Sequence, residues 1–189
     1  MVLPVVIITI LLKLCSLQMM VLSSPVCRLQ GVLVQSAHHL LRDLGGPFPV
    51  HCVKYNANIS FPDSVLTAVA ASHAQCHQVL WVLNESLDGA RQVFENHSLP
   101  EDGLEWDEVK FDNFQNLQYQ LLGEWRCSSN VESSDVLSSY FKNVTAVLQQ
   151  QDSAACGWMA LRRDLLCVLK SALQQYHSCF TWRHARHQH

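Results

Sequence analysis

Apolar residues recur at steps of three and four along most of the chain, which is the spacing of one face of an α-helix. The longest run lies between residues 156 and 176, and its apolar positions are Trp158, Leu161, Leu165, Leu169, Ala172, Leu173 and Tyr176. Arg163 and Lys170 lie on the opposite side, and Arg162 falls at the edge of the apolar stripe, where its guanidinium is expected to reach water. A single amphipathic helix cannot bury its own stripe, so this helix must pack against others.

Four earlier segments carry the same periodicity, at residues 28–44, 62–83, 105–126 and 134–148, and a piece at 87–94 could continue the second one. Gly45-Gly46-Pro47 ends the first helix, because glycine accepts the left-handed conformation of a helix end and proline cannot continue the helix. A loop over 45–61 follows, which is long for a helix connection unless it crosses the bundle or has a function. No segment alternates as a strand would, so the pattern predicts an all-α fold.

The first 24 residues have the features of a secretory signal peptide. Residues 2–12 are apolar apart from Thr9, and Lys13 then interrupts the run, so it is too short for a membrane span. Ser23 and Ser24 are small residues suited to cleavage, and no later segment could cross a bilayer. We therefore expect a secreted, extracellular protein without membrane insertion, with one helical domain over residues 25–189.

Secretion changes how the cysteines are interpreted, because pairs form in an oxidising compartment. Seven cysteines follow the leader: Cys27, Cys52, Cys76, Cys127, Cys156, Cys167 and Cys179. An odd number leaves at least one free or paired between chains. Cys76 lies on an apolar face and is expected to be a small buried hydrophobe, and Cys167 and Cys179 could be free. Twelve residues apart on one helix, about 18 Å, those two cannot pair with each other.

Four N-glycosylation sequons agree with an exterior compartment. They begin at Asn58, Asn84, Asn96 and Asn143. Each triplet alone is weak evidence, whereas four of them after a leader are more informative. We expect glycans on some of them when a eukaryotic cell secretes the protein.

The composition excludes several function classes. The net charge is −3, so nothing in the bulk electrostatics favours nucleic acid. Acids dominate from Glu85 to Asp135 and basic residues dominate after Cys156. His73 and His77 lie one helical turn apart, but ordinary helix-side histidines are favoured over a metal pair. The chain has no glycine-rich phosphate loop and no nucleophile elbow, so we expect no catalytic residue, metal or cofactor, and no enzyme.

One motif carries a family resemblance. Tyr140-Phe141-Lys142-Asn143-Val144 is followed by Leu148 and, after seven more residues, by Cys156-Gly157-Trp158. This pattern resembles the signature of type I interferons, especially the virus-induced teleost type. It departs from the family preference at Val147 and Gly157 but keeps the spacing. The Phe61-Pro62 pair before the second helix is also similar to the family.

The resemblance implies a fold and a cysteine framework. The fold is an up-up-down-down helical cytokine bundle of five main helices with a long first crossover loop. The four-cysteine interferons pair the first cysteine with the third and the second with the fourth, which implies Cys27–Cys127 and Cys52–Cys156 here. A third bridge from Cys76 to one of the remaining cysteines is possible, and the chain could be a monomer or a weak dimer.

The resemblance also implies a function, that of an antiviral cytokine. Such a protein binds and clusters two cell-surface class II receptor chains and triggers JAK-STAT signalling. The first helix, the long loop and the last helix would meet the high-affinity chain, and the next three helices the other. Arg162, Arg163, Lys170 and Lys54 are the expected contacts, and Arg162→Ala should weaken binding without changing the melting temperature. The alternatives are an interleukin-10-like cytokine and a secreted carrier of an apolar ligand.

Overall fold

The computed structural model describes residues 28–71, 75–100, 103–125 and 134–182. The described residues contain six α-helices, which are α2 (Gly31–Asp43), α3 (Asp63–Ala71), α4 (Gln75–Asn96), α5 (Glu108–Gly123), α6 (Asp135–Leu148) and α7 (Ala154–Gln175). Three 3₁₀ helices join them, namely η1 (Val50–Asn58), η2 (Gln151–Ser153) and η3 (His177–Cys179). The strands β1 (Leu29–Gln30) and β2 (Phe180–Thr181) pair in parallel. The expected signal peptide lies outside the described residues.

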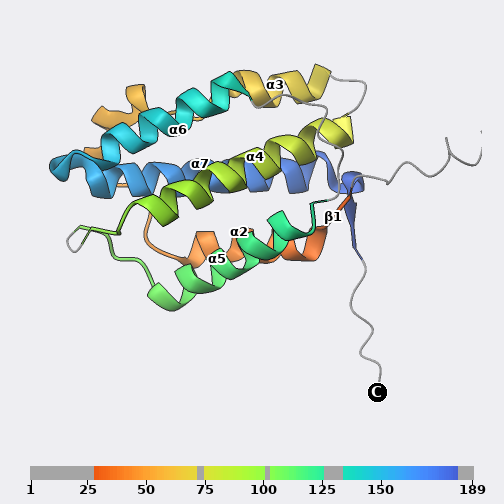
Figure 1. The fold of residues 1–189 in the computed structure, drawn as a ribbon, viewed down its shortest axis with the longest axis horizontal. Helices are drawn as coiled ribbons and strands as arrows, with labels where there is room; N and C mark the ends of the chain where they lie inside the picture. Colours follow the sequence, from red (N-terminus) through yellow and green to blue (C-terminus); the bar gives the residue numbers. More distant parts are fainter. Residues whose placement is uncertain (1–27, 72–74, 101–102, 126–133, 183–189) are drawn as a thin grey trace, which may run out of the picture.

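The helices form three layers (Figure 1). The middle layer holds α4 and α7, the layer of α2 and α5 packs on one side of it, and the layer of α3 and α6 packs on the other. In this view α2 and α4 run in one direction and α5 and α7 in the other. The expected all-α, up-up-down-down arrangement is therefore confirmed, and the five longer helices are α2, α4, α5, α6 and α7.

The second helix differs from its predicted boundaries. Two antiparallel helices, α3 and α4, replace the single helix predicted over 62–83 with its continuation (Figure 1). The apolar steps persist on both sides of the break, and neither glycine nor proline marks it, so periodicity alone could not locate it. The parallel strands were missed because two residues are too few to show alternation.

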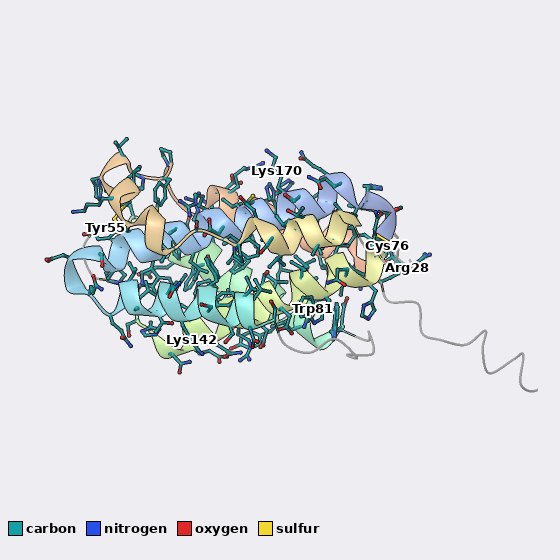
Figure 2. The ribbon with its side chains drawn as sticks, turned by 90° about the horizontal axis from the view of Figure 1, so that it is seen from above. Arg28, Tyr55, Cys76, Trp81, Lys142 and Lys170 are labelled. Carbon is teal, nitrogen blue, oxygen red and sulfur yellow. A yellow bond between two sulfur atoms is a disulfide. The ribbon has the colours of Figure 1, made fainter. Side chains whose placement is uncertain are left out.

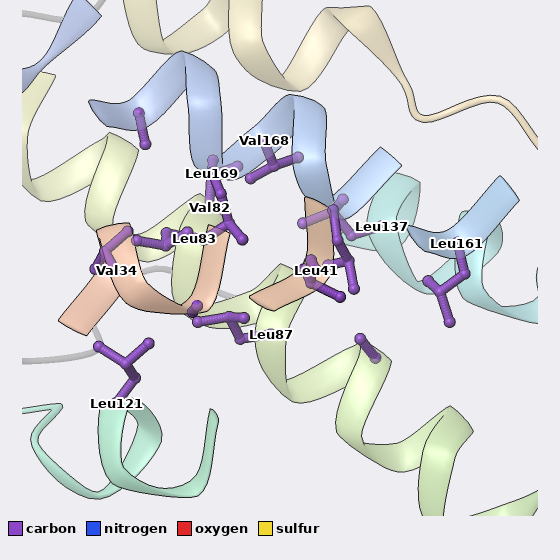
Figure 3. Packing of buried hydrophobic residues seen from close by; sticks show 14 of the residues in the cluster. Val34, Leu41, Val82, Leu83, Leu87, Leu121, Leu137, Leu161, Val168 and Leu169 are labelled. Atoms are coloured by element: carbon purple, nitrogen blue, oxygen red, sulfur yellow. The ribbon is translucent and has the colours of Figure 1, made fainter. Parts of the chain in front are cut away.

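The core lies between the middle layer and its neighbours. Figure 3 shows Val34 and Leu41 of α2, Leu83 and Leu87 of α4 and Leu169 of α7 among its packed side chains. Burying a side chain of this size stabilises the fold by about 1.5–3 kcal/mol. The apolar stripe predicted for the last helix is confirmed at its central positions, because Trp158, Leu161, Leu165 and Leu169 are all buried.

An aromatic cluster closes the core around Trp158, which is only 1% exposed. The ring of Phe94 from α4 stacks on it at 5.6 Å between centroids with an interplanar angle of 14°. Trp106 meets it edge-on at 6.0 Å. These contacts join α4, the segment before α5, and α7, so the tryptophan of the signature motif is a packing centre.

Candidate functional site

The loop over 45–61 is fixed to α7 by a disulfide between Cys52 of η1 and Cys156. The bridge spans 104 residues of sequence, and both cysteines are buried. This prediction is confirmed. The imidazole of His51 lies close to both sulfurs, but a sulfur bonded to another sulfur offers no thiolate to a metal ion. The other predicted bridge, Cys27–Cys127, lies outside the described residues.

A second bridge joins Cys76, at the start of α4, to Cys179 in η3. The expectation that Cys76 is a buried hydrophobe is wrong, because its side chain is exposed and its sulfur is bonded. Cys179, for which the sequence left a free thiol open, is its partner and is buried. Cys167 is the free cysteine of the described residues, and it is exposed on α7. The third bridge that the sequence left open therefore runs from Cys76 to Cys179.

Arg162 does not project its guanidinium into water, which corrects the sequence-based expectation. Its side chain is 7% exposed and crosses from α7 to the end of α2. Nε donates to the Leu41 carbonyl at 2.6 Å, and the terminal nitrogens donate to the carbonyls of Arg42, Gly45 and Gly46, each at 2.7 Å. Burial lowers the pKa of Arg162, and the nearby Asp43 carboxylate opposes this effect.

Two of these bonds cap the carbonyls of Leu41 and Arg42 at the end of α2, and the other two hold Gly45 and Gly46 directly after it. The last carbonyls of a helix have no partner within the helix, and a cation near them is favoured by the helix dipole. Leu44 keeps a right-handed conformation, and Gly103 is the one described glycine with a positive φ, at 80°. The left-handed cap expected at Gly45 and Gly46 is therefore absent, and Arg162 supplies the cap from another helix.

Arg163 fastens the far end of the same loop. Its guanidinium lies 4.7 Å from the centroid of the Phe48 ring and donates to the Ile59 carbonyl at 3.3 Å. It also forms an ion pair with the neighbouring Asp164 at 2.7 Å. The side chain is 31% exposed, so part of it can still meet a partner. Arg162 and Arg163 together hold both ends of the loop against α7.

Asp164 is a buried carboxylate beneath this loop. It accepts a hydrogen bond from the Tyr140 hydroxyl at 2.9 Å and is also bonded by Arg163 and by the backbone N–H of Phe61. Burial is the largest influence and raises the pKa of Asp164, although these three partners lower it. Burial, followed by the charge of Asp164, raises the pKa of Tyr140 well above its usual value. The tyrosine of the signature motif thus links α6 to α7.

Exposed and half-buried side chains of the loop and of α7 form one face of the molecule, which we call the loop face. It comprises Val50, Val53, Lys54, Tyr55, Arg163 and Lys170. Val50 is 87% exposed and Val53 is 53% exposed, whereas most large apolar side chains of the described residues are covered. The Lys54 ammonium lies 4.8 Å from the Tyr55 ring centroid. Figure 2 shows Tyr55 and Lys170 along one edge of the molecule and Lys142 at the other.

The loop face has a positive surrounding. Lys170 of α7 is exposed, and Arg42 of α2 is also exposed but forms an ion pair with Asp43 at 2.7 Å. Both cations act on His38, and Asp43 opposes them. Burial, together with the positive charges of His39, Arg42 and Lys170, lowers the pKa of His38. A surface that combines exposed apolar side chains with basic ones is suited to a protein partner that carries acids.

A groove of about 700 Å³ runs between α4 and α6, and we call it the α4–α6 groove. Glu85, Asp88 and Gln92 line it from α4, and Phe141 and Lys142 line it from α6. The helices approach closely because α4 has a glycine at the contact: a Cβ on Gly89 would lie 2.1 Å from the Phe141 ring. The second aromatic residue of the signature motif thus lines the groove where the two helices are in contact.

The α4 wall of this groove is acidic. Burial and the neighbouring Asp88 raise the pKa of Glu85, which shows that the two carboxylates act on one another. Arg91 pairs with Asp88 at 2.8 Å and with Glu95 at 2.7 Å and neutralises part of this charge. The α4 wall of the groove and the loop face therefore differ in charge.

The four predicted glycosylation sites lie in different surroundings. Asn58 is the last residue of η1, and the exposure of its side chain is not described. Asn84 is half-buried within α4, and the serine of its sequon, Ser86, is fully buried. Asn96 at the end of α4 and Asn143 on α6 are exposed.

None of the helices in the described part of the chain has the length and apolar character needed to cross a membrane.

Known proteins resemble this chain over most of its length. A sequence model described as the interferon alpha/beta domain matches residues 29–179. Interferon beta of Tachyglossus aculeatus aculeatus is 26% identical over 137 residues, which is 67% of this chain and 70% of that relative. The structure of zebrafish interferon 2 is 31% identical with a TM-score of 0.61, and the match covers 78% of this chain and 99% of that one. The region from β1 to η3 therefore carries the shared features.

Proposed function

Since the chain belongs to the type I interferon family, also described as interferon alpha/beta, we propose that it is a secreted antiviral cytokine that clusters two cell-surface receptor chains. As a member of this family it is a cytokine and not an enzyme. The proposal extends to class II receptor chains, to JAK-STAT signalling and to the induction of antiviral genes. It also includes an extracellular location and a monomer or weak dimer as the active form.

The first receptor chain is assigned to the loop face. The observation that supports this best is the anchoring of a loop that exposes apolar side chains: Arg162, the Cys52–Cys156 bridge and Arg163 all fix it to α7. An interface that is ordered before binding loses less conformational entropy when the partner arrives. Arg163, Lys170 and Lys54 are proposed as contacts. Arg162 is proposed to act through the loop, because its guanidinium is already occupied by four carbonyls.

The second receptor chain is assigned to the opposite side, at the α4–α6 groove and the adjoining α5. The groove offers an acidic α4 wall and the ring of Phe141, whereas the loop face offers bases and exposed valines. Two faces of different charge favour two different partners and disfavour an exchange between them. Clustering requires two separate surfaces, and Figure 2 supports this, because Lys170 and Lys142 lie at opposite edges.

Two exposed valines provide a test of the first assignment. Val50→Ser on the loop face should weaken binding to the ectodomain of the high-affinity receptor chain by about tenfold, as for an apolar contact worth about 1.4 kcal/mol. Val109→Ser on α5 is the matched control, because that valine is 69% exposed and is not one of the residues of the loop face. Equal affinities for the two variants and the wild type would contradict the assignment of the loop face.

Signalling itself needs a cell-based measurement. Cells with a reporter gene driven by an interferon-responsive promoter should respond to the wild-type protein and respond less to Val50→Ser. Matched cells that lack either receptor chain should give no response. A response that persists without both chains would rule out the proposed receptor pair.

A further inference from the structure

One sequon, Asn96-His97-Ser98, borders the α4–α6 groove. Asn96 is the last residue of α4, is exposed, and lines the groove together with His97. Its Nδ2 donates to the Gln92 carbonyl at 2.8 Å, and Gln92 lines the same wall one turn earlier. On the other wall, Thr145 of α6 and Gln149, which directly follows α6, border the groove.

The chemistry of N-glycosylation is compatible with this geometry. A cellular transferase joins C1 of the sugar to Nδ2 of asparagine, the C1–O bond to a polyprenyl-diphosphate carrier breaks, and one amide proton leaves. The second Nδ2 hydrogen remains, so the bond to the Gln92 carbonyl can be kept after modification. That bond would hold the first sugar against the wall of the groove.

We propose that an N-glycan on Asn96 covers one end of the α4–α6 groove and weakens the binding of the second receptor chain. This inference rests on the proposed function, in which that chain docks at the groove. A glycan is bulky and strongly hydrated, so it excludes a protein surface from the area that it covers. The glycan acts as a selective gate, because the loop face lies on the other side of the molecule and keeps its affinity.

Asn143 provides a matched comparison on the groove's other helix. It is exposed on α6 but borders a different hollow, together with Ser60, Pro62 and Val136. A glycan on Asn143 therefore points away from the α4–α6 groove and should leave the affinity for the second receptor chain unchanged. The same modification on the two helices of the groove is thus expected to have different effects. A glycan on Asn96 lowers the affinity for the second receptor chain, whereas one on Asn143 does not.

The test compares glycoforms secreted by a eukaryotic cell line. The wild type, Asn96→Gln, Ser98→Ala and Asn143→Gln are purified, and glycopeptide mass spectrometry measures the occupancy of each sequon. Ser98→Ala removes the glycan while it keeps the asparagine, so it separates the sugar from the side chain. The ectodomains of the two receptor chains are immobilised separately, and the affinity of each glycoform is measured. Thermal unfolding of each variant accompanies the binding data.

The expected result is specific to one site and one receptor chain. Asn96→Gln and Ser98→Ala should bind the second receptor chain about tenfold more tightly than the glycosylated wild type does. Their affinity for the first receptor chain should equal that of the wild type. Asn143→Gln should match the wild type on both. An unmodified Asn96, or equal affinity of the wild type and Ser98→Ala for the second chain, would overturn the gate while leaving the proposed function intact. If neither ectodomain bound any glycoform, both proposals would be wrong.

Discussion

Replacing Arg162 by alanine should destabilise the fold, because it removes the cap of α2. Four backbone carbonyls lose their donors together. The bond to Leu41 is buried, and loss of a charged partner there costs about 2 kcal/mol. The other three are partly buried, so water restores some of the loss, and each costs about 0.5–1 kcal/mol. We expect Arg162→Ala to lower the free energy of unfolding by about 4 kcal/mol.

Urea-induced unfolding followed by circular dichroism measures this loss, and a thermal scan should show the melting temperature falling by about 10 °C. Arg162→Lys keeps the charge near the end of α2 but lacks the planar fork, so it should recover about half of the lost stability. Lys170→Ala is the control, because Lys170 is an exposed cation on the same helix. Its effect should stay within about 0.5 kcal/mol.

Two outcomes would refute the reasoning. Unfolding of Arg162→Ala at the same midpoint as Lys170→Ala would mean that the four carbonyls do not depend on the guanidinium. A stable Arg162→Ala variant with reduced affinity for the first receptor chain would support the expectation drawn from the sequence, in which Arg162 is a direct contact. The structure predicts that affinity and stability fall together.

Three further substitutions test other parts of the structure. Gly89→Ala should destabilise the fold by about 1–3 kcal/mol in urea unfolding, because the added Cβ overlaps the Phe141 ring. Removal of the Cys76–Cys179 bridge by a double serine variant should lower stability by about 2–5 kcal/mol, since the bridge spans 103 residues, and non-reducing peptide mapping of the wild type should show the linked pair. For Asp164, burial raises the pKa in the folded state, so wild-type stability should fall as pH rises from about 4 to that raised pKa. Asp164→Asn should lack this slope in stability measured against pH.

The sequence predicted those parts of the fold that each helix determines by itself. Ser134 or Asp135 was predicted to begin α6. The helix begins at Asp135, and Ser134 is its cap, because its hydroxyl accepts a hydrogen bond from the Leu137 backbone N–H. The stripes of α6 and α7 were also predicted, because a helix in a bundle buries one face whatever its neighbours are. The break between α3 and α4 could not be located, since apolar residues continue at helical spacing on both sides of it.

The candidate site depended on partners distant in sequence, and here the sequence was less informative. The carbonyls that bind Arg162 are 116 to 121 residues away from it. The one available signal was its angular position, because a residue at the edge of an apolar stripe is often partly covered. Cys76 was misassigned for a similar reason: an apolar face near a helix start is also a place where a cysteine can meet a partner. Its partner, Cys179, lies 103 residues further along the chain.

The anchors of the long loop have a consequence for how the receptor site should be mapped. Arg162 holds Gly45 and Gly46, the disulfide holds Cys52, and Arg163 holds Ile59, so α7 fixes the loop at its start, middle and end. These anchors restrict the loop backbone before any partner binds, and such a restriction reduces the entropy lost on binding. Substituting an exposed residue should therefore change affinity alone, whereas substituting an anchor changes affinity through stability and loop order. An alanine scan that measures affinity alone would thus place Arg162 in the interface, although its guanidinium is bound within the protein.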